Sequence, residues 1–584
     1  MFSAFQTFGR LGAGARAVAW SPTTLFAAGE KGGLWDFSTL ANLYKDSAGT
    51  TPCTAVGDPI GLVLDTKNGT PVLGPELAPG GGTFDSATGW NVPAEWSISG
   101  GVATHSGTIN NLTPSTPILT IGKTYQIQVN ILAVPTGFQV SAGGTYSGTG
   151  LSLGVNTLRL QCTSDTTLRL QAATGQATVL ESISVREIPG NHLTQSTSTK
   201  RPTLGRMPAT GVRNLLTHTE DFSNAAYGTH VNLSVSANAA AAPDGTNTAD
   251  LLIENSASGV HFIGQSFLSA ISGNSYTISV FAKKKEREWL CIGQTVGTAS
   301  PINSSRVWFN LTTGTVGTAS AGYTGSIASL GNGWYRCTAT ATFTISSGNA
   351  ISPFVGISTA DNQTTHVGDG ASGLYVWGFQ LELGSTATAY QRVGDPYDIT
   401  ESGVASVYTA YFDGVDDCLV SPSIDFSGTD AMSVFAGFRK TSDAARGMVA
   451  ELSATTASNN GSFALTAPNA ASATIVYESK GTALTDTSAT IAAPADSVIA
   501  AVSDISADSN VLRRNGAEAE SDTGDQGTGN FGNYPIYVGQ RNASSYPYKG
   551  FLSALCTRGA ATDATTITNM EQWLAARTPG VTLP

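Results

Sequence analysis

The chain has 584 residues, which is too long for one hydrophobic core, and at about 100–200 residues per domain it predicts roughly three to five folded units. Charged residues make up 12% and glycines number 66, a composition that favours strands and turns and predicts a mainly β protein. With 30 basic and 42 acidic residues the net charge is −12, so we expect no surface for nucleic acid.

Six cysteines are spread singly, without the CxxC pairs of zinc sites, and we expect them to stay reduced. Arg10 and Arg16 interrupt the N-terminal stretch, which does not resemble a secretory signal. No run of about 18 apolar residues predicts a membrane span. A chain of this kind that works outside the cell would leave by another route, such as lysis.

Residues 1–75 predict a small irregular adaptor. Its one helical candidate is "DFSTLANLYKDSAG" (residues 36–49), in which Ser38 or Thr39 can cap the N-terminus and Gly49 can end the helix. The following stretch, "TTPCTAVGDPIGLVLD", is punctuated by prolines and glycines.

Residues 76–188 alternate apolar and polar positions in short segments, as in "TYQIQVNILAV", and predict a β-sandwich. Both ends of such a fold can lie close together, which allows one domain to be inserted into a loop of another. "LVLDTKNG" and "PGNHLTQ" would then be the two sides of one interrupted loop. The adaptor accordingly comprises residues 1–75 plus 189–212.

Two further units follow, a sandwich at residues 213–392 and, after a polar connection at 393–405, a jelly roll at 406–584. In "WYRCTATATFTI" alternate side chains share one face, the period-2 signature of a half-buried strand. In the last unit Asn515–Gly516 predicts a tight hairpin turn. Asp563 can cap a terminal helix whose apolar side chains share a face, namely Ile567, Met570 and Leu574.

Several segments resemble modules of bacteriophage and prophage virion proteins, of the tail-fibre or head-fibre type. "LWDFSTLANLYKDSAGTTPCTAVGDPIGLVLD", continued by "GNHLTQSTSTKRPTL", resembles a recurrent virion module. "RNLLTHTEDFSNAAY" and "LGNGWYRCTATAT" look like a carbohydrate-binding-module-like sandwich, as do "GTFDSATGW" and "ISVREI" in the inserted unit. "AYFDGVDDCLVSPSIDFSGTDAMSVFAGFRK" with "MEQWLAAR" is similar to concanavalin-like, laminin-G-like jelly rolls.

The resemblance implies multi-domain antiparallel β-sandwiches (jelly rolls) with a small irregular N-terminal adaptor and a C-terminal helix. It covers nearly the whole chain, with residues 1–30 matched least. Because such folds host many functions, the function has to be argued from a site.

A sugar-binding surface needs aromatic faces for the apolar side of a pyranose, together with polar groups for its hydroxyls. The alternative for each tryptophan is a place in a sandwich core, the interpretation that strand-like alternation favours for Trp334 and Trp377. Loops at sandwich ends carry function more often. The carbohydrate-binding candidates are Trp90, Trp96, Trp289, Tyr534, Tyr546, Tyr548 and Arg541.

Carboxylates cluster in "FDGVDD" as Asp413, Asp416 and Asp417, and "GDG" adds Asp369. Calcium takes several hard oxygen ligands, and the resemblance implies that a structural calcium is a possible cofactor here. Tight turns select Asp and Gly as well, so a plain turn is the alternative at each place.

Catalytic patterns are scarce, and we expect no catalytic residues and no enzyme activity. No Gly-x-Ser-x-Gly elbow and no His pair at metal-ligand spacing occur. A pair of glycosidase carboxylates stays open, because such groups need only meet in space. The charge run "AKKKER" (residues 282–287) is either a solvated loop or a contact for an anionic glycan or lipopolysaccharide phosphate.

These patterns lead to one main hypothesis: a phage virion structural protein (fibre, spike or tail-tip component) that displays β-sandwiches for host-surface glycan binding. Its expected partners are other virion proteins and host polysaccharide or lipopolysaccharide, and family analogy predicts a homotrimer assembled in the host cytoplasm and released by lysis. The alternatives are a purely structural capsid or tail decoration protein and a polysaccharide-degrading tail enzyme.

Overall fold

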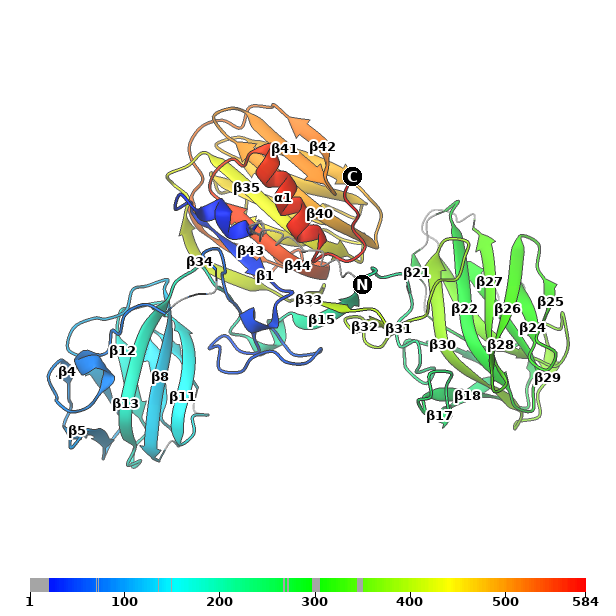
Figure 1. Cartoon of the computed structure of the whole chain (residues 1–584), viewed down its shortest axis with the longest axis horizontal. Coiled ribbons are helices and arrows are strands. Elements are labelled where there is room, and N and C mark those ends of the chain that lie inside the picture. Colours follow the sequence, from blue (N-terminus) through cyan, green and yellow to red (C-terminus); the bar gives the residue numbers. More distant parts are fainter. Residues whose placement is uncertain are drawn as a thin grey trace, which may run out of the picture.

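The computed structural model describes residues 20–69, 71, 73–134, 136–148, 150–265, 268–269, 272–296, 305–343 and 350–584. Figure 1 shows three lobes in a row, with the lobe of residues 76–188 (cyan) on one side and that of residues 213–390 (green) on the other. The predicted mainly β class with antiparallel sheets is confirmed. Within the described ranges no helix has the length and apolar character needed to cross a bilayer.

The central lobe is a sandwich assembled from three separate stretches of the chain. Near the N-terminus, β1 (Gly32–Asp36) pairs with β44 (Lys549–Arg558), and β15 (Thr203–Pro208) pairs with β33 (Ser406–Asp413). On the opposite sheet, β14 (Leu193–Thr194) pairs with both β3 (Leu62–Val63) and β34 (Leu419–Asp425). The structure therefore differs from the expected separate adaptor, because these segments supply strands to both sheets of the jelly roll.

The two central sheets share one large core that includes Trp35, Phe412, Phe438 and Tyr477. One sheet has the order β15-β33-β44-β35-β40-β41-β42, with β1 beside β44, and its remaining strands are β35 (Ala431–Lys440), β40 (Ala495–Asp504), β41 (Ser509–Arg514) and β42 (Ala517–Asp522). The other has the order β2-β3-β14-β34-β43-β36-β37-β38-β39, from β2 (Leu43–Tyr44), β3 (Leu62–Val63), β14 (Leu193–Thr194), β34 (Leu419–Asp425), β43 (Asn533–Val538), β36 (Met448–Leu452), β37 (Ser462–Thr466), β38 (Thr474–Lys480) and β39 (Leu484–Thr490).

The helix expected at residues 36–49 is wrong. This stretch forms a single 3-10 turn and then enters β2, where Leu43 is fully buried in the central core. A short helix is marginal by itself, so the strand pairing and burial outweigh its local preference. The 3-10 helices are η1 (Pro22–Phe26), η2 (Leu40–Asn42), η3 (Pro79–Gly82) and η4 (Ser198–Lys200).

The lobe of residues 76–188 leaves the central sandwich after β3 and returns at β14, and these two strands are paired with each other. Its two sheets have the orders β10-β9-β12-β7-β4 and β11-β8-β13-β6-β5. The strands are β4 (Trp90–Asn91), β5 (Trp96–Ser99), β6 (Val102–His105), β7 (Asn110–Pro114), β8 (Thr124–Ala133), β9 (Gln139–Ala142), β10 (Thr145–Tyr146), β11 (Gly154–Gln161), β12 (Leu168–Ala172) and β13 (Val179–Ile188).

The lobe of residues 213–390 is likewise placed between two paired strands, β15 and β33. Its sheets have the orders β16-β20-β28-β23-β24-β25, with β21 beside β28, and β17-β18-β30-β22-β27-β26, plus the small pair β19-β29. The strands are β16 (Thr229–Val231), β17 (Leu233–Ala240), β18 (Ala249–Glu254), β19 (Ser258–Gly259), β20 (His261–Gly264), β21 (Leu268–Ser269), β22 (Ser275–Lys284), β23 (Trp289–Val296), β24 (Ser305–Asn310), β25 (Thr315–Ala319), β26 (Tyr323–Gly331), β27 (Trp334–Thr342), β28 (Ala350–Ser358), β29 (His366–Val367) and β30 (Gly373–Leu383).

The alternation predicted for β27 is confirmed, with Cys337, Ala339 and Ala341 buried on its inner face. After this lobe the chain forms the hairpin β31 (Gln391–Val393) and β32 (Ile399–Glu401) where a polar connection was expected.

Two further local predictions are confirmed. Asn515 and Gly516 both have positive φ and connect β41 to β42 as a two-residue turn. The helix α1 (Ala564–Ala575) begins after Asp563, whose carboxylate accepts the backbone N–H of Thr566 at 3.0 Å. In Figure 1 this helix lies across β35 and β40. All six cysteines are buried and none forms a disulfide.

Candidate functional site

Three of the predicted sugar-binding rings are buried in cores, which corrects the prediction for them. Trp90 is 6% and Trp96 4% exposed, and both belong to the core of the 76–188 lobe. Tyr548 is 1% exposed, packs in the central core and donates its hydroxyl to Arg439 O at 2.9 Å. None of the three presents a ring face on which a sugar could stack.

Trp289 and Tyr534 are half-buried. Trp289 packs on a small cluster that includes Phe262 and Trp308, and Tyr534 packs on the central core with its hydroxyl donating to Asn460 O at 3.3 Å. Each ring therefore packs against the core of its own lobe, and only part of its surface is open to a ligand.

Tyr546 is different, because its side chain is 40% exposed. Among the aromatic side chains that the structure describes, Tyr546 and Tyr146 of the 76–188 lobe are the exposed ones. The guanidinium carbons of Arg446 and Arg541 each lie 5.2 Å from the centre of the Tyr546 ring. The ring is therefore held by cation–π contacts while part of its surface stays open to solvent.

The segment of residues 541–546, which we call the Tyr546 loop, has a strained but well-bonded backbone. Asn542, Ala543 and Tyr546 all have φ near +50°, a region that residues with a Cβ enter at a cost. Arg541 donates its backbone N–H to Ser545 O at 2.8 Å, and Tyr546 O accepts from the backbone of β36 at 2.9 Å. Such strain persists only where the surroundings impose it, and it occurs often at binding sites.

Two ion pairs fix the side chains of Arg446 and Arg541. Arg541 Nε lies 2.8 Å from Glu451 Oε2, and Arg446 Nη2 lies 2.6 Å from Glu478 Oε1. The hydroxyl of Thr456 lies 2.9 Å from Glu451 and 3.1 Å from Glu478, so it bridges the two carboxylates. The site is therefore a rigid arrangement of one open ring and two charge-paired guanidiniums.

Strand alternation explains why the glutamates lie there. In β36 the neighbours of Glu451, Ala450 and Leu452, point into the central core, so the carboxylate points to the outer face of the sheet, where a loop covers it. The sequence analysis identified Tyr546 and Arg541 but missed the other partners. A charged residue inside an otherwise apolar strand, as in "MVAEL", is the signal that could have found Glu451, whereas "TIVYESK" also carries Ser479 and Lys480 and gives no such signal for Glu478.

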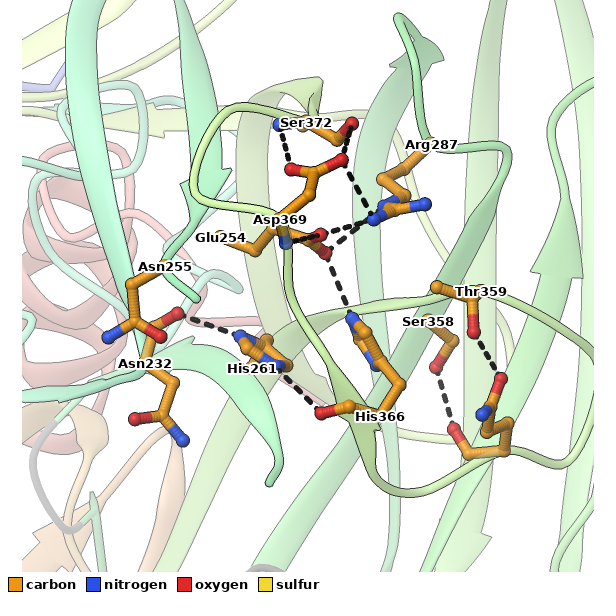
Figure 2. Close-up of polar contacts among 12 residues, drawn as sticks. Asn232, Glu254, Asn255, His261, Arg287, Ser358, Thr359, His366, Asp369 and Ser372 are labelled. Carbon is orange, nitrogen blue, oxygen red and sulfur yellow. Dashed lines mark hydrogen bonds and ion pairs between the residues drawn. The ribbon is translucent and has the colours of Figure 1, made fainter. Parts of the chain in front are cut away.

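A second polar cluster lies at one end of the 213–390 lobe. Figure 2 shows Glu254 approached by the Arg287 guanidinium, by the His366 ring and by the backbone N–H of Asp369. Burial alone would raise the pKa of Glu254, but the hydrogen bonds from Arg287 and His366 outweigh it and hold the pKa below its usual range. The cluster ties two loops together and exposes no aromatic ring.

Asp369, a predicted metal ligand, belongs to this cluster. Its carboxylate accepts from the Ser372 hydroxyl at 2.6 Å and lies 3.2 Å from Arg287, and the bonds from Ser372 lower its pKa. Within the described residues it is not part of any group of three potential metal ligands. Arg287 comes from the "AKKKER" run, of which Lys284 and Lys285 remain exposed.

The other predicted metal ligands do come together. One oxygen each of Asp413, Asp416 and Asp417 lies within 4.8 Å of the others. Burial first, and then the charges of Asp413 and Asp416, raise the pKa of Asp417 to about 7. The same residues also build the turn, since Asp417 accepts the Asp413 backbone N–H at 2.9 Å and Asp413 accepts that of Val415 at 2.7 Å. The geometry suits a hard cation or a plain turn.

No family model and no curated protein matches this chain. Among solved structures it is similar to a mutant NanB sialidase from Streptococcus pneumoniae, at 17% identity over 27% of this chain and 27% of that one, with a TM-score of 0.22. A Ruminococcus gnavus IT-sialidase CBM40 bound to α2,3-sialyllactose shares 14% over 24% and 81%, at 0.21. The botulinum neurotoxin type G receptor-binding domain shares 9% over 28% and 42%, at 0.23. The chain thus spans about a quarter of the sialidase.

Proposed function

We propose that this protein binds host-surface glycans through the Tyr546 loop of its central sandwich. The observation that carries the proposal is the exposed Tyr546 ring, which Arg446 and Arg541 hold from two sides. A pyranose has an apolar face that stacks on an aromatic ring, and its hydroxyls pair with neighbouring polar groups.

Rigidity of the site supports this proposal. Binding costs less when the groups that meet the ligand are already ordered, and the two ion pairs with Glu451 and Glu478 order both arginines in advance. The strained backbone of the Tyr546 loop is consistent with selection for a displayed side chain, because a relaxed turn would satisfy packing alone.

In its biological setting the protein is a structural component of a phage virion, a fibre, spike or tail-tip protein, and it acts without cleaving the glycan. The support is the sequence resemblance of its modules, and assembly in the host cytoplasm with release at lysis is part of the same proposal. Attachment to other virion proteins would use the part of the central sandwich to which residues 1–75 and 189–212 contribute strands. Several copies, a homotrimer by analogy, would raise a weak affinity through effective concentration.

The decisive experiment compares full-length wild-type protein with Tyr546→Ala on a glycan array and on purified bacterial surface polysaccharides. We expect Tyr546→Ala to weaken binding at least about ten-fold, because a central aromatic contact is lost. Tyr146→Ala is the matched control, since it removes another exposed tyrosine from a different lobe. Equal binding by Tyr546→Ala, or no glycan binding by folded wild-type protein, would contradict the proposal.

The virion assignment has its own test. Antibody labelling of particles in electron micrographs should place the chain on the tail or head surface, and mass measurement at micromolar concentration should give a trimer. Release of reducing ends from a bound polysaccharide would instead identify an enzyme.

A further inference from the structure

A cavity of about 340 Å³ lies where the 76–188 lobe meets the central sandwich. Three lysines line it from three separate segments: Lys31 just before β1, Lys67 four residues after β3, and Lys123 just before β8. Asp425 is the acidic residue among its lining residues. In a chain of net charge −12, this is a local concentration of positive charge.

The positive charges repel one another. Burial lowers the pKa of Lys67, and the charges of Lys31 and Lys123 lower it further, against the opposing effect of Asp65. The Lys67 ammonium donates a hydrogen bond to Gly32 O at 2.9 Å and lies 5.8 Å from the centre of the Phe26 ring. An anion in the cavity would relieve this repulsion.

The acidic groups nearby compensate these charges only in part. Asp425 accepts from the Ser427 hydroxyl at 2.6 Å and from its backbone N–H at 3.0 Å. Glu187 lies 3.1 Å from Lys123, but their side chains are 32% and 49% exposed, and ion pairs at such exposure are weak. Lys123 can therefore exchange Glu187 for a ligand at little cost.

The remaining walls indicate the kind of anion. Ile121, which is 54% exposed, and the rings of Pro189 and Pro422 give the cavity an apolar side, and Asn68 adds an amide. Its volume lies in the range of small-molecule sites, roughly 300–1,000 Å³. A ligand with a carboxylate and an apolar ring face fits these walls better than a bare inorganic ion.

We propose that this cavity binds an acidic sugar, a hexuronate unit, whose carboxylate lies between Lys31 and Lys67 of the central sandwich and Lys123 of the 76–188 lobe. The site is separate from the Tyr546 loop, and it does not depend on glycan binding there. Because the lysines come from two lobes, a bound hexuronate would also bridge them.

The test is a titration of the full-length protein with D-glucuronate, followed by calorimetry or ligand-observed NMR, with methyl glucoside and inorganic phosphate as parallel probes. With the Tyr546 ring removed by Tyr546→Ala, we expect glucuronate to bind, methyl glucoside not to bind, and phosphate to bind more weakly than glucuronate. Added salt should weaken glucuronate binding, since the contact is between charges. The double variant Lys31→Gln with Lys123→Gln should bind about ten-fold more weakly.

The control variant is Lys284→Gln with Lys285→Gln, which removes the same charge from exposed positions of the other lobe and should leave affinity unchanged. Each titration is also run in a Tyr546→Ala background, in which sugar bound at the proposed glycan loop no longer contributes to the signal. The single Lys31→Gln variant repeats the test if the double variant does not fold. Equal binding of methyl glucoside, tighter binding of phosphate, undiminished glucuronate binding by the lysine variants, or no binding at all would overturn the proposal.

Discussion

Two lobes of this molecule each contain a fully buried glutamate paired with an arginine, yet the two sites present different surfaces. In the central sandwich the Glu451–Arg541 pair lies beneath a strained loop and holds an exposed ring. In the 213–390 lobe Glu254 contacts both Arg287 and His366, which come from two different segments of the chain, and these segments cover the ion pair (Figure 2). A buried ion pair fixes a loop in both cases, and what the loop leaves exposed decides whether a ligand can bind.

The largest effect should come from removing the glutamates. Glu451→Ala leaves the Arg541 charge, whose side chain is 12% exposed, without its partner, and we expect the free energy of unfolding of the central sandwich to fall by about 3–5 kcal/mol. Glycan binding should be lost as well, because Tyr546 loses its support. Denaturant unfolding and glycan binding, measured side by side, check both expectations.

Glu254→Ala is the matched variant in the other lobe. It should destabilise its own lobe by a similar amount and leave glycan binding intact. If Glu451→Ala lowers the free energy of unfolding by less than about 1 kcal/mol, the Glu451–Arg541 pair does not hold the Tyr546 loop in place.

The next largest effect is a difference between the two lobes in how their free energy of unfolding depends on pH. The pKa of Asp417 in the fold is about 7 against an ordinary 3.8, so its protonated form stabilises the central sandwich below about pH 4 and this contribution is lost as the pH rises through 7. Asp417→Asn should therefore raise the free energy of unfolding at pH 8 by on the order of 2 kcal/mol, measured with a chelator present.

Glu254 has the opposite sign. Its pKa is lowered from 4.5, so its contribution is present above that value and is lost as the pH falls through the lowered pKa. Acid should weaken the 213–390 lobe while it favours the Asp417 turn. For the Asp417 prediction, an unchanged free energy of unfolding of Asp417→Asn at pH 8 would show that the fold does not raise the pKa of the Asp417 carboxyl.

The smallest effect concerns the backbone of the Tyr546 loop. Ala543 has φ +51°, where glycine carries no Cβ penalty, and Ala543→Gly should raise the free energy of unfolding by up to about 1 kcal/mol. Ala507→Gly, at an exposed turn position outside the positive-φ set, should lower it by about 0.5–1 kcal/mol. A loss of stability in both variants would mean that the loop is not strained at Ala543.

Local patterns in the sequence were enough for the inner face of one strand, for one hairpin turn and for the start of the terminal helix. Period-2 alternation identified the inner face of β27, and Asn515–Gly516 and Asp563 marked a turn and a helix start, because each depends on residues a few positions apart. The same local reasoning failed at residues 36–49, where β2 forms through pairing with β3, close to twenty positions further along the chain.

Tertiary structure alone decided which side chains reach solvent and which distant segments meet. Trp96 and Tyr546 look alike as loop aromatics in the sequence, but one is 4% and the other 40% exposed. β1 pairs with β44 at the far end of the chain, and Glu451 forms an ion pair with Arg541. Both contacts depend on the packing of whole sheets, which covers one face of each strand. Alternation of apolar and polar residues predicts that a strand has one buried and one exposed face. The free energy of packing the complete sandwich determines what lies against each of them.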